Sequence, residues 1–166
     1  MFAKSFCRTF VASSLVVAGS MLAAPAMADT VNLGGSVADT SAVTSSPTAE
    51  AAALSLYGVG TAQTNVVVKV ADLALITNNT TGVTLTAAGD AGLTNGTSTL
   101  PYQVLIVADA AAAPADTSFA SATDTDTVND FVSGAAARDL YIEYDAPALL
   151  DSGAYTGAIT VSVVAL

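Results

Sequence analysis

Residues able to do chemistry are scarce in this chain, and the densest group is the acidic stretch DTDTVND at residues 124–130. Asp124, Asp126 and Asp130 offer carboxylate oxygens at a spacing that loosely resembles a calcium-binding loop. The stretch lacks the glycine expected at the sixth position of such a loop, and Ala135 stands at the twelfth, where a bidentate glutamate would bind. A solvated acidic loop is therefore the expected structure, with calcium binding at Asp124, Asp126 and Asp130 as the weaker hypothesis.

Catalytic groups are poorly represented. The chain contains no histidine, and its single cysteine, Cys7, lies near its start. A Ser-His-Asp triad, a cysteine–histidine pair and imidazole zinc ligands are therefore excluded. No tryptophan accompanies the acidic residues, so a carboxylate pair for glycoside hydrolysis has little support. We expect a protein that is not an enzyme and that uses no cofactor.

The first 28 residues have the pattern of a secretory signal peptide. Lys4 and Arg8 form a basic start, an apolar run interrupted by serine and glycine follows, and AMA at 26–28 fits the small-x-small cleavage pattern. The run is shorter than the about 20 apolar residues that a membrane-spanning helix needs. We expect cleavage after Ala28, passage through the periplasm to the cell surface, and no membrane span in the mature chain.

Removing residues 1–28 would leave Lys69 and Arg138 as the only basic side chains against 14 acidic ones. This balance disfavours nucleic acid and anionic membrane surfaces as partners, because both are bound through lysine and arginine. The mature chain would also lose Cys7, so its fold cannot rely on a disulfide and must be stabilised by an apolar core. Its length fits one domain.

Apolar residues alternate with a period of two through most of the remaining chain, which predicts β-strands separated by turn residues. We expect about seven short strands and therefore an antiparallel, Ig-like β-sandwich over residues 39–166. The strands are predicted at 30–37, 42–44, 64–77, 83–87, 100–108, 138–145 and 153–166.

Two features interrupt this pattern. The alternation slips near Ala71–Asp72, which predicts a β-bulge in the longest strand. Residues 109–137 are rich in alanine, aspartate and threonine, and we expect a long acidic connection there.

The stretch TVNLGGSV at 30–37 would directly follow the expected cleavage site. Val31, Leu33, Gly35 and Val37 form one row of its alternation, with a glycine where a side chain should pack. One interpretation is a strand donated to another molecule, with Gly35 at a point where only backbone fits. The other is a first strand of the chain's own sheet, with a bulge at Gly34–Gly35.

With these strands in view, the chain resembles the spore coat protein U and chaperone–usher fimbrial subunit group of secreted β-sandwich proteins. Three stretches carry the resemblance: TVNLGGSV near the start, LTNGTSTLPYQVLIVADAA in the middle and SGAYTGAITVSVVAL at the end. Members of this group commonly have a disulfide near the start of the domain, and the expected mature chain has no cysteine.

The resemblance implies a structural subunit whose sandwich lacks one strand. A neighbour's N-terminal extension, residues 29–38 with Val31, Leu33, Gly35 and Val37, would fill an acceptor groove lined by Ile159, Val161 and Val163. It further implies a homopolymer at the cell surface, assembled with a periplasmic chaperone and an outer-membrane usher.

The alternative function is a monomeric extracellular module of the same fold. Such a module would bind a glycan or calcium through residues 109–137.

Overall fold

The computed structural model describes residues 33–56 and 60–166. These fall into two units that meet between Ser36 and Val37, and the fold below is that of residues 37–166. The two helical segments described are single 3-10 turns, η1 (Glu50–Ala52) and η2 (Asp116–Ser118). Within the described ranges, no helix has the length and apolar character needed to cross a membrane.

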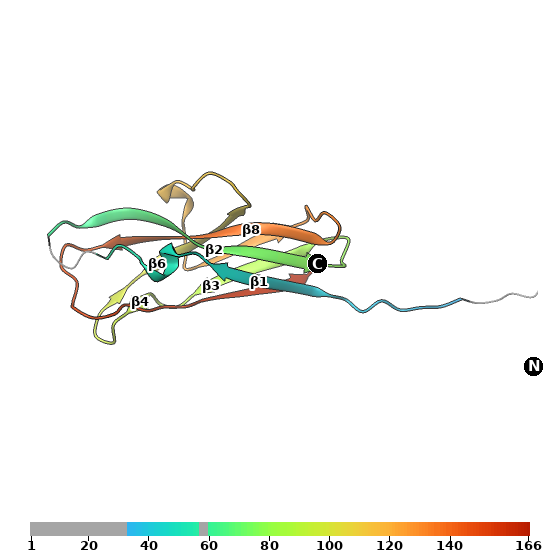
Figure 1. Cartoon of the computed structure of the whole chain (residues 1–166), viewed down its shortest axis with the longest axis horizontal. Helices are drawn as coiled ribbons and strands as arrows, with labels where there is room; N and C mark the ends of the chain where they lie inside the picture. The colour runs from blue at the N-terminus through green and yellow to red at the C-terminus, as the bar shows by residue number, and fades with distance from the viewer. Residues whose placement is uncertain (1–32, 57–59) are drawn as a thin grey trace, which may run out of the picture. The chain divides into compact units, whose positions relative to one another are not determined.

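The described residues otherwise form β-strands joined by turns and connections (Figure 1). The strands are β1 (Ser41–Pro47), β2 (Gln63–Thr77), β3 (Val83–Gly89), β4 (Leu93–Thr94), β5 (Thr99–Leu100), β6 (Tyr102–Ala108), β7 (Thr123–Val128), β8 (Ala135–Ala146) and β9 (Ile159–Ala165).

The strands form two main antiparallel sheets and one small hairpin. One sheet has the order β1-β2-β8-β6, the other has the order β7-β3-β9, and β4 pairs with β5. The inner rows of both main sheets contribute to a single apolar core. The predicted all-β, antiparallel sandwich is confirmed.

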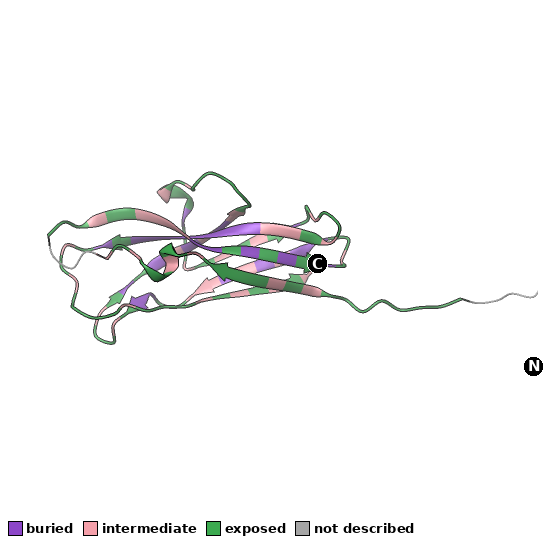
Figure 2. Ribbon diagram, in the orientation of Figure 1, coloured by how far each residue is buried: buried purple, intermediate pink, exposed green. Residues whose placement is uncertain are grey.

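The core has its most deeply buried residues in the central strands. Leu73 and Leu75 of β2, Leu85 of β3, and Leu140 and Tyr144 of β8 are almost completely buried. Figure 2 shows buried residues concentrated along β8, whereas β1 is mostly exposed. Central strands are covered on both sides by neighbours, and β1 is an edge strand.

The bulge predicted in the longest strand is present. Pairing between β2 and β8 shifts between Lys69 and Ala71, so that Val68 faces Ile142 and Ala71 faces Leu140. Val70 is the extra residue and is buried. The bulge explains why the alternation of apolar residues slips at this point in the sequence.

Two expectations about individual segments were wrong. Residues 109–137 are not one irregular connection, because they contain β7. The last strand begins at Ile159, and the residues from 153 to 158 make only an isolated bridge, between Thr94 and Thr156. The expected count of about seven strands agrees with the two main sheets, which have four and three strands in the described residues, and the β4–β5 hairpin adds two short ones.

Candidate functional site

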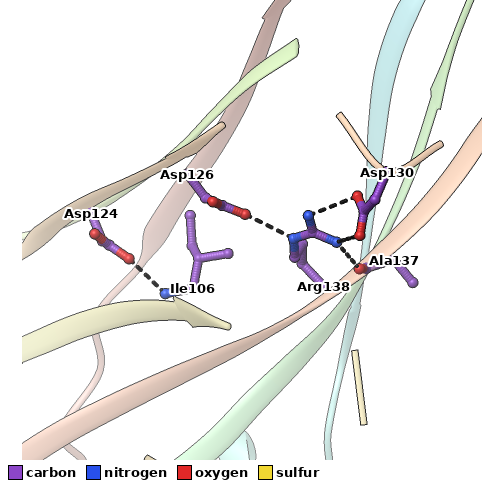
Figure 3. Close-up of polar contacts among 6 residues, drawn as sticks. All are labelled: Ile106, Asp124, Asp126, Asp130, Ala137 and Arg138. Carbon is purple, nitrogen blue, oxygen red and sulfur yellow. Dashed lines mark hydrogen bonds and ion pairs between the residues drawn. The ribbon is translucent and has the colours of Figure 1, made fainter. Parts of the chain in front are cut away.

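The two sides of the sandwich differ, and the side where β6 and β7 meet is closed. The amide of Val104 donates a hydrogen bond to the carbonyl oxygen of Ser121 (2.9 Å). The amide of Ile106 donates to Asp124 Oδ2 (2.7 Å), as Figure 3 shows. These bonds join an edge of the four-stranded sheet to an edge of the three-stranded sheet.

Arg138 reinforces this closed side from β8 (Figure 3). Its Nε lies 2.7 Å from Asp126 Oδ2, and its guanidinium binds both carboxylate oxygens of Asp130, at 2.8 and 3.1 Å. It also donates to the carbonyl oxygen of Ala137 (2.8 Å). Hydrogen bonding to Arg138 holds the pKa of Asp130 below its usual range. The arginine is buried, so these partners satisfy a charge that would otherwise be costly to remove from water.

The acidic stretch is therefore not a solvated loop, and this expectation is corrected. Asp124 and Asp126 lie on β7 and are half-buried, and at the closed side their carboxylates accept hydrogen bonds from the amide of Ile106 and from Arg138. Asp130 follows the strand and pairs with the same arginine. Within the described residues, no group of three or more potential ligands is arranged to hold a metal ion.

Calcium is expected to have no effect on stability. Binding calcium at Asp126 and Asp130 would require both carboxylates to leave Arg138, which would leave a buried guanidinium unpaired. The thermal midpoint measured with millimolar calcium should equal that measured with EDTA at the same ionic strength. A midpoint that rises with calcium and saturates would contradict this and restore the calcium hypothesis.

The opposite side of the sandwich is open. β1 ends the four-stranded sheet and β9 ends the three-stranded sheet, so each has one edge without a strand partner in the described part of the chain. The two strands lie near one another, in blue and red in Figure 1. Each is seven residues long. An exposed edge with free amides and carbonyls is a template for another strand.

An apolar groove lies between these two edges and reaches into the core. Its volume is about 230 Å³, compared with the about 10–15 Å³ that one water molecule requires. The lining residues come from β1, β2, β4, β6, β8 and β9, from η1 and from the residues next to these elements: Ser45, Pro47, Ala51, Leu54, Val70, Ala71, Leu93, Tyr102, Leu140, Ile142, Gly157, Ile159 and Val161.

The groove is open because the inner row of β1 changes character along the strand. Val43 packs against the core, but Ser45 and Pro47, which follow it on the same face, are exposed and line the groove. Leu140 and Ile142, at the base of the groove, are nevertheless only 2% and 3% exposed, so the core beneath the groove is covered. The opening lies at the two edges, where Ser45 and Pro47 of β1 and the half-buried Ile159 and Val161 of β9 form the lining.

The predicted acceptor residues lie on the inner row of β9. Ile159, Val161 and Val163 are each half-buried and pack against the core. Ile159 and Val161 line the groove, and Val163 lies further along the strand, opposite Leu85. The structure therefore places two of the three in the groove wall.

The predicted donor residues are only partly described. Val31 lies outside the described residues. Residues 33–40 have no regular secondary structure, and Leu33 and Val37 are 93% and 88% exposed. A Cβ atom added at Gly35 would meet no other atom within 4 Å. No bulge at Gly34–Gly35 within a strand of the chain's own sheet is therefore seen.

Tyr102 fixes the beginning of β9 at one end of the groove. Its hydroxyl donates to the carbonyl oxygen of Ala158 (2.8 Å) and accepts from the amide of Asp90 (3.1 Å). The Asp90 carboxylate in turn accepts from the amide of Ala158 (3.0 Å). Gly89 allows the ring to lie here, because a Cβ at Gly89 would lie 2.6 Å from it.

The sequence analysis did not identify Tyr102 as a residue that fixes the last strand. Tyr155 packs against the core, and its hydroxyl has no hydrogen-bond partner among the described residues. The sequence shows a proline before Tyr102 and a glycine at position 89. Neither residue indicates that the Tyr102 hydroxyl binds the carbonyl oxygen of Ala158.

Together these features define an antiparallel β-sandwich with two different sides. One side is closed by Arg138 and its aspartate partners, and the other is open along an apolar groove. No protein-family model matches the chain, and the search of curated proteins found no match either. What the protein does must be inferred from the groove and the residues around it.

Proposed function

We propose that this protein is a secreted structural subunit of a surface polymer, in which the N-terminal extension of one copy enters the groove of the next. The single observation that carries the proposal is the apolar groove between the unpaired edges of β1 and β9. An extended peptide can join such an edge by backbone hydrogen bonds while its alternate side chains fill the groove.

The proposed donor matches the groove in length and pattern. The row from Val31 to Val37 spans seven residues, the same length as β1 and as β9. Leu33 and Val37 are large apolar side chains left exposed in the isolated chain. Their burial in a neighbour would each contribute about 1.5–3 kcal/mol. Ile159 and Val161 would form the wall against which they pack.

The alternative of a monomeric module that binds a glycan or calcium through residues 109–137 has less support. Two of its candidate ligands, Asp126 and Asp130, are engaged by Arg138, and Asp124 accepts an amide hydrogen bond. Export through a periplasm, and the involvement of a chaperone and an outer-membrane usher, remain parts of the proposal that follow from the resemblance.

Engineered cysteines test the proposal, because Cys7 is the chain's single cysteine and should be removed with the signal peptide. Cells would express two forms together, one with Leu33→Cys and the other with Ile159→Cys or Val161→Cys. A donated strand brings the two Cα atoms within the about 4.4–6.8 Å that a disulfide spans. We expect a reducible dimer of the two forms on non-reducing gels for at least one groove position.

The control replaces Thr125, an exposed residue of β7 on the closed side, by cysteine in the acceptor form. Cross-linking to Thr125→Cys as efficient as to the groove positions would show nonspecific contact and contradict the proposal. A single chain carrying both Leu33→Cys and Val161→Cys provides the second control. An internal disulfide in its monomer would show that the extension fills its own groove.

A further inference from the structure

The outer face of the four-stranded sheet contains a buried acidic residue that the groove does not involve. Glu143 of β8 is only 9% exposed, although its side chain points away from the main core. Phe119 and Tyr141 are also buried without belonging to that core. The connection 109–122, which includes η2, approaches β2 and covers this face. A second, smaller buried layer therefore exists beneath the connection.

Glu143 lies directly opposite Gln103 of β6 in the sheet register. Side chains at directly opposed positions have Cβ atoms about 4.5–5.5 Å apart, so the carboxyl and the amide can reach one another. Gln103 Oε1 is buried and has no hydrogen-bond partner among the described residues. Leaving such an acceptor unsatisfied is unfavourable, and an ionised carboxylate has no proton to donate to it.

The groups around Glu143 also oppose its ionisation. On β8 it has Asp145 two residues further along, and η2 brings Asp116 near it. On β2 it faces the apolar Val67. The nearest cation on this face, Lys69, pairs with Asp72 and Asp139 at 2.7 and 2.8 Å. Burial, together with the charges of Asp145 and Asp116, raises the pKa of Glu143.

We propose that Glu143 and Gln103 form an acid-stabilised latch beneath the 109–122 connection. The protonated carboxyl of Glu143 donates a hydrogen bond to Gln103 Oε1. Ionisation removes this proton, leaves Gln103 Oε1 unpaired and adds repulsion between Glu143 and Asp116 of η2. Because η2 carries Asp116, this repulsion loosens the connection as the pH rises, and protonation of Glu143 in acid removes it.

The direction in which pH changes stability follows from the linkage between folding and protonation. Because the folded chain raises the pKa of Glu143, folding favours the protonated form. The contribution of Glu143 to stability is highest at low pH. This contribution is lost as the pH rises from about 4.3, the usual pKa of glutamate, through the raised pKa that Glu143 has in the folded chain. Asp130, whose pKa is lowered, has the opposite dependence, so single variants must be compared with the wild type at each pH.

The decisive variant is Glu143→Gln in the exported chain, because its amide can donate to Gln103 at every pH. We expect its thermal midpoint to exceed that of the wild type by about 2–8 °C at pH 8 and to approach the wild-type value near pH 4. Hydrogen exchange of residues 109–122, corrected for intrinsic rates, should be about tenfold faster in the wild type at pH 8 than in the variant. Glu50→Gln is the matched control, since Glu50 is the other glutamate and is exposed.

A second pair of variants separates the hydrogen bond from simple loss of charge. Gln103→Met removes the acceptor, and in that background the advantage of Glu143→Gln at pH 8 should shrink, because only the relief of the buried charge and of its repulsion with Asp116 and Asp145 remains. A lower midpoint for Glu143→Gln than for the wild type at pH 8 would overturn the latch, because it would show that the ionised carboxylate is the stabilising partner of Gln103. An equal shift for Glu50→Gln, or an advantage that persists undiminished with Gln103→Met, would also overturn it.

Discussion

Replacing Leu85 with alanine should lower the free energy of unfolding by about 2–5 kcal/mol. Leu85 is 0% exposed and lies in the middle of β3, between Asp126 of β7 and Val163 of β9. Its side chain packs in the core that both sheets share, so its removal leaves a cavity that neither sheet can readily close. Domains typically have only about 5–15 kcal/mol of stability, and equilibrium unfolding in urea would measure the change.

Leu149→Ala is the matched control for this prediction. Leu149 is 78% exposed, and its truncation should change the free energy of unfolding by less than about 0.5 kcal/mol. A cost for Leu85→Ala as small as that of the control would contradict a core built from both sheets.

Replacing Gly35 with leucine should abolish polymers without destabilising the subunit. A Cβ at Gly35 meets nothing within 4 Å in the isolated chain, so the folded monomer accommodates the side chain. In a neighbour's groove the same side chain would overpack, at a cost of about 1–3 kcal/mol per junction. That cost weakens each junction by about 5- to 150-fold. Unheated gels of protein sheared from cells would measure the polymers, and thermal unfolding would measure the monomer.

Gly34→Leu provides the control for Gly35, because Gly34 belongs to the opposite row of the alternation. A side chain there would point out of the neighbour's groove, and polymers should persist. If the Gly35→Leu protein formed as much polymer as the wild type, the proposal that residues 30–37 are a donated strand would be contradicted. A monomer destabilised by Gly35→Leu would instead place residues 30–37 in the chain's own sheet.

Most of the sandwich could be predicted because its strands carry an apolar row. Alternation located β2, β3, β6, β8 and β9, and even the bulge at Val70 could be read from a slip in the pattern. β7 could not be found in this way, since TDTDTV has aspartate where an apolar residue would mark the inner row. Its aspartates can be half-buried because Arg138 and the amide of Ile106, which lie on other strands, donate hydrogen bonds to them.

The groove was only partly predictable for a similar reason. Ile159 and Val161 were found from alternation along the last strand, within a few residues of sequence. The opening itself depends on where the edge of β1, with the exposed Ser45 and Pro47, lies relative to the edge of β9. The positions of strands relative to one another depend on contacts between residues far apart in the sequence. The periodicity of one segment carries no information about such contacts.

The geometry of the open side has a mechanical consequence for a polymer built as proposed. Hydrogen bonds between strands run across the strand axis, and β1 and β9 are each seven residues long, with alternate residues directing their amides and carbonyls to the open edge. Tension along a filament would pull a donated strand lengthwise, so all of its bonds would share the force at once instead of opening one after another. The filament's tensile strength would then be set by the length of these two edges, in a chain whose single cysteine is expected to be lost before assembly.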